Sequence, residues 1–323
     1  MDRPRPLERA DGDDMDLSSS KSTLGSYLPF RPPSATVTVE FGAVTHPGRR
    51  RATSDDHYLI VELGRTQRTI ASSLPPGAVP DRFDESAYGM VVADGMGPNG
   101  PEIASRLALT TLAQLVLQYG KWNVRVNEQT AWEIVQRAER YYQRVGETIT
   151  DASHQHPSLA GMSTTLTAAY SAGDELFVVH VGHSRAYLYR GGLLTRLTRD
   201  QTLAQRLAET GRTAPTELAA HDLRHVLTDA LGGHAGAPDI DIQNYLLMDG
   251  DVVMVCTNGL TDMVEDDRIA SVLRAGAGQP LAPQCQTLLD LALERGGPDN
   301  ITAVLARYRI PERRTQPYPR GFA

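Results

Sequence analysis

Apolar and polar residues alternate along several short segments of this chain, a pattern typical of β-strands with one buried face. Residues 35–41 are the clearest case, because β-branched Thr and Val follow one another there in strict alternation. Glycine-bearing turns separate several segments, at Gly173, around Gly182 and at Gly191-Gly192. The pattern predicts strands at residues 35–41, 57–62, 88–93, 164–170, 176–181, 186–190, 251–257 and 301–309.

Other segments carry apolar residues at helical spacing. In residues 102–119 these are Ile103, Leu107, Leu112, Leu115 and Val116, and a proline precedes the segment, where a helix commonly begins. The spacing predicts helices at residues 102–119, 127–152, 200–210, 222–231, 266–274 and 283–295.

Strands and helices follow one another in blocks: a series of strands, then a pair of helices, twice over. This order differs from the strict strand–helix alternation of a parallel doubly wound sheet. We therefore expect an α+β protein with antiparallel sheets whose outer faces are covered by helices.

Three segments lack this periodicity. Residues 1–33 are rich in Asp, Arg, Ser and Pro, and residues 311–323 are similar, so both are predicted to be disordered tails. Residues 64–86 are polar and contain proline, which predicts a long loop between two strands. One domain over residues 34–310 is the simplest division.

Amino-acid composition and net charge bear on the class of partner that this protein could bind. The 323 residues are 41% hydrophobic and 22% charged, as in ordinary globular proteins, and the net charge is -7. This charge argues against a nucleic-acid partner bound through bulk positive charge, since the only dense basic run is Arg49-Arg50-Arg51.

Cysteine content and hydropathy bear on the compartment. Two cysteines, Cys256 and Cys285, do not make a disulfide framework in a chain of this length, so reduced thiols are expected. No apolar run reaches the ~18 residues of a membrane span, and the N-terminus lacks a signal-peptide core. We expect a soluble cytoplasmic protein without a membrane partner.

Two segments place a carboxylate at the end of an apolar run, beside Gly or Asn. They are Val91-Val92-Ala93-Asp94-Gly95-Met96-Gly97 and Gly297-Pro298-Asp299-Asn300-Ile301-Thr302. Carboxylate oxygens suit hard divalent cations, and the carbonyl of Gly95 offers a further oxygen ligand. The segments are far apart in sequence, so only folding could join them in one metal site.

Six blocks in order resemble the metal-dependent serine/threonine protein phosphatases of type 2C, also called PPM. Any one of them would be weak evidence, but together they span the chain from Arg51 to Arg309. They are Arg51 with Ser54-Asp55-Asp56; Val92 to Gly97; Met162-Ser163-Thr164-Thr165; Val181-Gly182-His183-Ser184-Arg185-Ala186-Tyr187; Cys256-Thr257-Asn258-Gly259-Leu260-Thr261-Asp262; and Gly297 to Thr302.

The resemblance implies a fold and a set of site residues. The fold is a sandwich of two antiparallel β-sheets with helices on both outer faces (α-β-β-α). The cofactors would be two divalent metal ions, Mn²⁺ or Mg²⁺ with Mn²⁺ favoured, and water activated between them would attack phosphorus. Asp94 aligns with the carboxylate that bridges both ions and Asp299 with a ligand of one of them. Gly95, Asp55 and Asp56 align with the groups around the other ion, and Arg51 with a phosphate-binding arginine.

The chain departs from the family pattern at three positions. Asn258 replaces a metal-binding aspartate, which predicts weaker metal affinity because an amide brings no negative charge; the loss is smaller if water or Asp262 compensates. His183 replaces an aspartate associated with a weakly held third ion: either this site prefers a transition metal or the third site is absent. Met96 stands where some members carry a histidine that protonates the leaving group.

Other residues in these blocks are expected to be structural. Thr164 and Thr165 should pack within a strand, and Ser184 and Arg185 should hold their hairpin through side-chain hydrogen bonds. Residues 200–222 correspond to the family's variable flap beside the site.

The leading hypothesis is hydrolysis of phosphoserine and phosphothreonine on proteins, in signalling opposite a kinase. Its expected partners are phosphorylated proteins, and a serine/threonine kinase or its targets. One alternative is a pseudophosphatase, a binding module with weak or no turnover, which Asn258 and His183 favour. Another is a regulatory phosphatase with a single dedicated phosphoprotein partner.

Overall fold

A computed structural model of the protein describes residues 37–121, 128–212, 222–233 and 236–310. The two predicted tails, residues 1–33 and 311–323, lie outside these residues. The chain divides into two compact units. The larger contains residues 33–65 and 85–323, and the described part of the smaller is Thr66–Asp84.

The first of two antiparallel sheets has five strands, in the order β1-β11-β10-β7-β8. In this sheet, β11 (Ile301–Arg309) pairs along its whole length with β1 (Thr38–His46). On its other edge, β11 pairs with β10 (Val252–Cys256). Strands β7 (Arg185–Arg190) and β8 (Leu193–Arg196) complete it.

The second sheet has six strands, five of them in the order β2-β3-β5-β6-β9. These are β2 (Asp56–Arg68), β3 (Arg82–Met96), β5 (Leu166–Ala172), β6 (Glu175–Val181) and β9 (Asp241–Leu246). The two-residue strand β4 (Ser163–Thr164) pairs with the end of β3.

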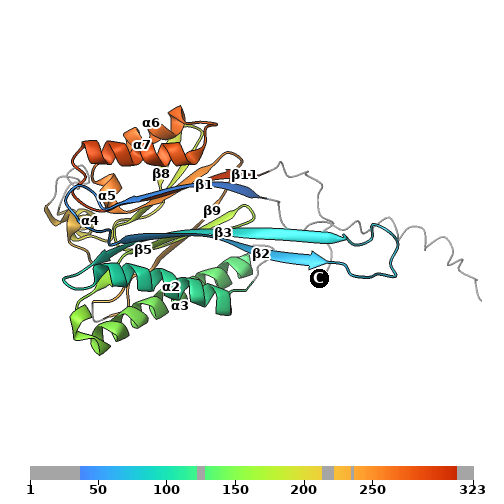
Figure 1. Ribbon diagram of the computed structural model, residues 1–323, viewed down its shortest axis with the longest axis horizontal. Helices are drawn as coiled ribbons and strands as arrows, with labels where there is room; N and C mark the ends of the chain where they lie inside the picture. Colours follow the sequence, from blue (N-terminus) through green and yellow to red (C-terminus); the bar gives the residue numbers. More distant parts are fainter. Residues whose placement is uncertain (1–36, 122–127, 213–221, 234–235, 311–323) are drawn as a thin grey trace, which may run out of the picture. The chain divides into compact units, whose positions relative to one another are not determined.

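Helices cover the outer face of each sheet (Figure 1). The second sheet is covered by α2 (Pro101–Tyr119) and α3 (Glu128–Gln155). The first is covered by α6 (Asp266–Ala275) and α7 (Leu281–Glu294), beside the single turn α5 (Asn258–Thr261). Among the described residues, short helices also lie in connections: the 3-10 turn η1 (Pro157–Leu159), α4 (Leu203–Glu209) and the 3-10 turn η3 (Asp222–His225).

Three hydrophobic cores separate these four layers because side chains alternate across each strand. In β10, Val253 and Val255 enter the core between the sheets, whereas Met254 enters the core beneath α6 and α7. In β3, Val92 enters the core between the sheets and Val91 the core beneath α2 and α3. The predicted α-β-β-α sandwich is confirmed.

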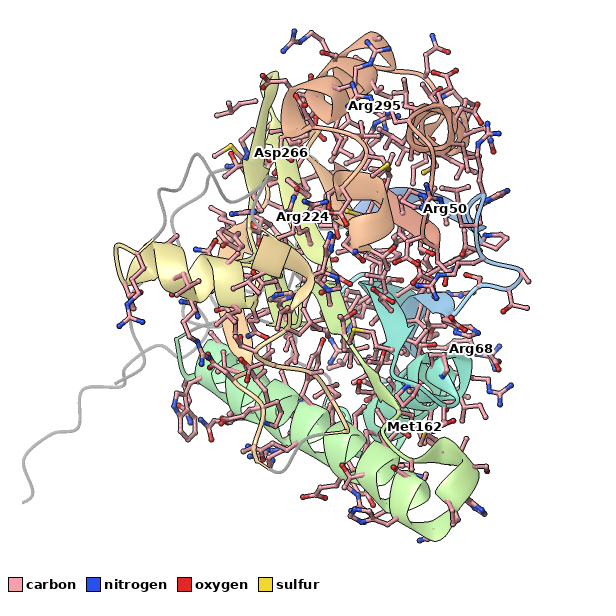
Figure 2. The ribbon with its side chains drawn as sticks, turned by 90° about the vertical axis from the view of Figure 1, so that its left-hand side faces the viewer. Arg50, Arg68, Met162, Arg224, Asp266 and Arg295 are labelled. Atoms are coloured by element: carbon pink, nitrogen blue, oxygen red, sulfur yellow. The ribbon has the colours of Figure 1, made fainter. Side chains whose placement is uncertain are left out.

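The two outer helical layers are also seen as separate layers when the molecule is turned by 90°. Asp266 and Arg295 lie with the helices over the first sheet, and Met162 lies beside the helices over the second (Figure 2). Met162 is fully buried, which anchors the connection between α3 and β4.

Two predictions about elements are wrong. The segment 64–86 is not all loop, because β2 continues to Arg68 and β3 already begins at Arg82. Polar side chains join these extensions, as in the 2.7 Å hydrogen bond from Thr66 Oγ1 to Asp84 Oδ1, so they lack the apolar alternation used to find strands.

The predicted helix 222–231 is the second error. Only η3 is helical, and the chain then runs in extended form, bridging Thr202 through Leu227 and Thr164 through Leu231. These long-range hydrogen bonds outweigh the local helical spacing. Strands β8 and β9 and the turn α5 are absent from the prediction. Both strands lie at sheet edges, and β9 is mostly polar.

Both cysteines are free and buried, and burial raises the pKa of each thiol to about 12. None of the helices within the described residues has the length and apolar character needed to cross a lipid bilayer.

Candidate active site

The candidate site lies where the ends of strands from both sheets meet. Asp56 is the first residue of β2, Asp94 lies near the end of the neighbouring β3, and Asp299 precedes β11 in the other sheet. The three carboxylates are close enough for the charges of Asp56 and Asp299 to raise the pKa of Asp94. Folding therefore brings together the acidic residues that the sequence analysis singled out.

Asp56 is buried, with 4% of its surface exposed. Thr257 Oγ1 donates a 2.7 Å hydrogen bond to Asp56 Oδ2, and Thr302 also hydrogen-bonds this carboxylate. Burial raises the pKa of Asp56 to about 7, against the effect of both threonines. The threonines come from the first sheet, so they fix Asp56 across the sandwich.

Asp94 is held through its backbone. Its N–H donates to Thr165 Oγ1 at 3.1 Å, and its carbonyl accepts from the N–H of Thr165 at 3.0 Å and from Thr164 Oγ1 at 2.8 Å. Both threonines are buried, as expected of structural residues. Thr165 Oγ1 also bonds Ser184 Oγ, which links Asp94 to the turn after β6.

The carboxylate of Asp94 has a different environment. No hydrogen bond or ion pair to it is made by any residue within the described ranges. The side chain keeps some contact with solvent but is densely surrounded by protein atoms. Burial, and next the charges of Asp56 and Asp299, raise the pKa of Asp94 well above its ordinary value. A cation would satisfy such a group.

Asn300 holds the loop before β2 in place. Its Oδ1 accepts from the Asp55 N–H at 2.7 Å, and its Nδ2 donates to the carbonyls of Pro47 and Thr53, both at 3.0 Å. The N–H of Asn300 itself donates to Asp299 Oδ1 at 3.0 Å. This residue thus connects the Asp55–Asp56 pair with Asp299.

Gly95 occupies a position that allows no side chain. A Cβ there would lie 2.0 Å from the carbonyl oxygen of Pro101, at the start of α2. The Gly95 N–H donates to the carbonyl of Asp55 at 3.1 Å, and Ser105 Oγ donates to the same carbonyl at 2.6 Å. Burial raises the pKa of Asp55, and the positive charge of Arg51 opposes this rise.

Arg51 lies at the open side of the acidic group. Its Nε is 3.1 Å from Asp299 Oδ1, and 54% of its side-chain surface is exposed. Exposed ion pairs are worth at most about 1 kcal/mol, so this guanidinium can exchange Asp299 for another anion at little cost.

Asn258 begins α5 beside this group. The turn packs closely on the residue after Asp299, since a Cβ at Gly259 would lie 1.8 Å from the Asn300 carbonyl oxygen. Asn258 is buried, and its Nδ2 donates to Asp262 Oδ2 at 3.0 Å.

His183 lies in the predicted turn between β6 and β7, because β6 ends at Val181 and β7 begins at Arg185. Its Nδ1 is buried, and no group in the described part of the chain forms a hydrogen bond with it. Burial lowers the pKa of His183 to about 4, although Asp262 and Asp200 favour the charged form. His183 is therefore a neutral imidazole near neutral pH.

The neighbouring residues behave as expected. Arg185 holds the hairpin through two bonds to Asp200, Nε–Oδ1 at 2.9 Å and Nη2–Oδ2 at 2.6 Å. His180 contacts Thr167 Oγ1 and the Arg199 carbonyl with its two ring nitrogens, so it does not pair with His183. Met96 ends β3 opposite Ser163. The predicted flap, 200–222, is described only as far as Arg212 and at Asp222.

The donor set fits hard divalent cations, although no three Asp, Glu, His or Cys side chains within the described residues surround a common point closely enough to hold an ion. The carboxylates of this site repel one another because they carry like charges. Thr257 stabilises the carboxylate of Asp56 by a hydrogen bond, and Arg51 stabilises that of Asp299 by an ion pair. The unpartnered Asp94 carboxylate is the observation that favours a cation.

Thr257 and Asn300 have evident positioning roles that were not assigned from the sequence, whereas Asp262 was already named there as a group that would compensate for the missing charge of Asn258. Thr257 and Asp262 lie one residue before and four residues after Asn258, and Asn300 follows Asp299. Sequence proximity to a predicted ligand was the only available signal.

Comparisons with known proteins agree with this architecture. A family model described as Protein phosphatase 2C matches residues 81–294. The serine/threonine protein phosphatase PstP of Mycobacterium tuberculosis is 34% identical over 235 residues, which cover 71% of this chain and 43% of PstP.

Solved structures of PstP are also similar. A crystal structure of the M. tuberculosis phosphatase PstP matches with a TM-score of 0.66 and 30% identity, covering 83% of this chain and 98% of that one. A second structure, the catalytic domain of PstP in complex with two manganese ions, has a TM-score of 0.64 and 29% identity over 85% of this chain and all of that one. This chain belongs to the protein phosphatase 2C family. It spans less than half the length of full PstP.

Proposed function

We propose that this protein is a divalent-metal-dependent phosphatase that hydrolyses phosphoserine and phosphothreonine on proteins. The observation that carries the proposal is the Asp94 carboxylate, which has no polar partner among the described residues and lies within range of Asp56 and Asp299. The relatives named as serine/threonine phosphatases, and the two manganese ions in one of them, support it.

Asp94, Asp299, Asp56 and the Gly95 carbonyl would hold two ions, with Asp55 supporting them and Asn258 completing the position beside Asp299. Mn²⁺ is favoured over Mg²⁺ because the amide of Asn258 reduces the charge available to a strongly hydrated ion. Bound divalent ions supply Lewis-acid activation of water and neutralise phosphate charge.

The remaining chemistry belongs to the chain. Arg51 would exchange Asp299 for two oxygens of the substrate phosphate, which its planar guanidinium matches. Thr257 favours the ionised form of Asp56, which is the form that binds cations. Met96 has no proton to donate, so the leaving serine or threonine oxygen would take its proton from solvent.

His183 is the candidate ligand of a weakly held third ion. Its buried Nδ1 has no partner among the described residues, and its low pKa keeps the ring neutral, so the tautomer protonated on Nε2 would offer the Nδ1 lone pair to an ion. An imidazole at this position favours a transition ion over Mg²⁺.

We further infer a cytoplasmic signalling role opposite a serine/threonine kinase. The family relationship and the two free thiols support it. The partner phosphoproteins would be substrates of that kinase.

Hydrolysis of p-nitrophenyl phosphate and of a phosphothreonine peptide, each with Mn²⁺ and with EDTA, tests the proposal. Asp94→Ala should reduce both rates at least about 10³-fold, as expected when the central metal ligand is removed. Asp290→Ala on α7 is the matched control, because this carboxylate bonds only Gln286. Equal background rates for wild type and Asp94→Ala would instead identify a pseudophosphatase.

A further inference from the structure

Asp262 lies at the end of α5 and contacts the residue with which this chain departs from its family. Asn258 and Asp262 are four residues apart on one helical turn, so they share a face. Asn258 Nδ2 donates a 3.0 Å hydrogen bond to Asp262 Oδ2.

This bond determines which end of the amide remains available. A carboxylate can only accept hydrogen bonds, so Asn258 must turn its NH₂ group toward Asp262. Its Oδ1 is then the free end, and within the described residues no group donates a hydrogen bond to it. Asn258 is 7% exposed, so solvent satisfies this oxygen only in part.

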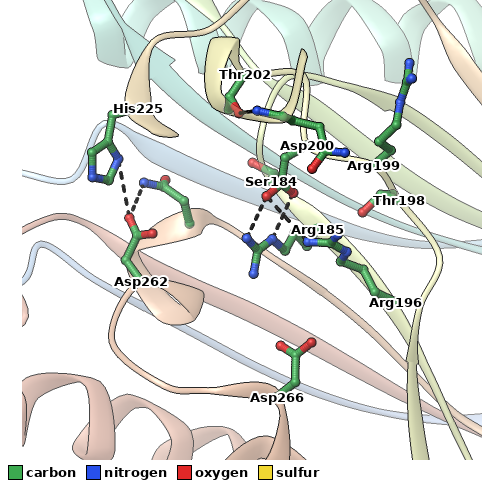
Figure 3. A network of polar contacts seen from close by, with 12 residues as sticks. Ser184, Arg185, Arg196, Thr198, Arg199, Asp200, Thr202, His225, Asp262 and Asp266 are labelled. Carbon is green, nitrogen blue, oxygen red and sulfur yellow. Dashed lines mark hydrogen bonds and ion pairs between the residues drawn. The ribbon is translucent and has the colours of Figure 1, made fainter. Parts of the chain in front are cut away.

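Other polar groups also converge on Asp262 (Figure 3). His225 of η3 places its Nδ1 3.7 Å from the same Oδ2 atom that accepts from Asn258. Asp262 is also the strongest charge acting on the buried His183. One carboxylate therefore contacts Asn258 and His225 and acts electrostatically on His183.

We propose that Asp262 is a positioning residue that turns Asn258 Oδ1 toward the ion held by Asp299 and supplies the negative charge that the amide lacks. This inference rests on the proposed function, because it concerns the same metal site. Asn258 and Asp262 act as one unit: an oxygen ligand whose dipole is strengthened by the carboxylate behind it.

The pairing works only with an amide at position 258. An aspartate there could not donate to Asp262, and two carboxylates at this separation would repel each other. After the substitution Asn258→Asp, a carboxylate at position 262 should no longer favour metal binding. The effect of Asp262 on metal affinity should therefore depend on the residue at position 258, and this can be measured.

Mn²⁺ binding to the full chain without substrate, followed by electron paramagnetic resonance of the free ion, tests the proposal. Asp262→Asn should weaken binding at least 10-fold, the lower end of the 10–100-fold range for residues that support metal ligands. The matched control is Asp266→Asn, since this nearby carboxylate accepts a hydrogen bond from Tyr187 and has no contact with Asn258.

A double-mutant cycle separates positioning from a structural role. In the Asn258→Asp background, Asp262→Asn should cost less than about 3-fold in Mn²⁺ affinity, because an asparagine at position 262 can donate to the new carboxylate. A penalty of equal size in both backgrounds, or one no larger than that of Asp266→Asn, would overturn the proposal.

Thermal unfolding checks that each variant is folded. If Asp262→Asn unfolds, Asp262→Glu replaces it in the test. Glutamate keeps the negative charge but moves it away from Asn258, so Mn²⁺ affinity should fall, by less than 10-fold. It should stay below the affinity of the matching Asp262 protein both with Asn258 and with Asn258→Asp. Full wild-type affinity of Asp262→Glu would count against a geometric role.

The failure of this inference differs from the failure of the proposed function. Wild-type protein that binds no Mn²⁺ and shows no Mn²⁺-dependent hydrolysis would refute the proposed function. Normal binding and turnover, with an unaffected Asp262→Asn variant, would refute only the role of Asp262.

Discussion

The two sides of the candidate site differ in charge. The side built on β2 and β3 presents Asp56 and Asp94, two carboxylates whose pKa values are raised first by burial and then by neighbouring carboxylates. The side built on α5 and the turn after β6 presents Asn258 and His183, which are an amide and a neutral imidazole. Asp299 lies beside α5 and pairs with Arg51.

This difference shows how a candidate metal site can keep its charge on one side and lose it on the other. On the carboxylate side, buried negative charges destabilise the metal-free protein, and a bound cation would remove this effect. On the amide side, the neutral groups destabilise the metal-free protein little. We therefore expect the first side to control whether ions bind, and the second to control which ions bind and how tightly.

The largest expected effect is on the stability of the metal-free protein. Asp56 has a folded pKa of about 7, above its ordinary 3.8, so the folded state binds more protons than the unfolded chain between these values. The unfolding free energy should therefore fall by roughly 2–4 kcal/mol from this group as pH rises from about 4 to 7.

Thermal unfolding in EDTA between pH 4 and 8 measures this slope. Asp56→Asn cannot titrate and should flatten it, and excess Mn²⁺ should reverse it in the wild type. The same slope in Asp56→Asn would show that Asp56 does not titrate with a raised pKa in the folded protein.

Arg51→Lys should lower kcat/KM for phosphopeptide about 10²-fold. An ammonium cannot replace the forked donors of guanidinium on phosphate, although the charge is kept. Since Arg51 is exposed, unfolding free energy should change by less than about 1 kcal/mol. Steady-state kinetics beside Arg50→Lys, which keeps the same loop composition, distinguishes phosphate binding from general loss of positive charge.

Thr257→Val should reduce Mn²⁺ affinity about 10-fold, since Asp56 loses the hydroxyl that favours its ionised form. Stability should fall by about 1–2 kcal/mol, because the Thr302 N–H also loses its acceptor. Thr261→Val is a sharp control: that hydroxyl is buried without a partner, so its removal should cost nothing. Equal losses in the two variants would contradict the role of Thr257.

The smallest effect is expected on the neutral side. His183→Asp should shift the ratio of Mg²⁺-supported to Mn²⁺-supported activity by about 3–10-fold toward Mg²⁺, because carboxylate suits the harder ion. His183→Asn is the uncharged comparison. An unchanged ratio would mean that no third ion is bound at this position.

Much of the fold was predictable because most strands alternate clearly and α3, α6 and α7 carry their apolar residues on one face. Errors occurred where tertiary contacts replaced that signal, as in the polar extension of β2 to Arg68 and the extended segment from Val226 to Leu231. The order of motifs indicated the family, and the carboxylates at strand ends indicated where a site would form.

The sequence by itself determined the candidates for the chemistry: the acidic side chains, the exposed arginine and the replacements at positions 183 and 258. It determined them because residue type and local spacing are written directly in the chain. Only the tertiary structure decided that Thr257 and Asn300 hold the acidic residues across the two sheets and that Asp262 bonds the Asn258 amide. The contacts of Thr257 and Asn300 with the acidic residues join segments as many as 245 residues apart, and their energy exists only when both sheets have packed, whereas the Asn258–Asp262 bond lies within one helical turn.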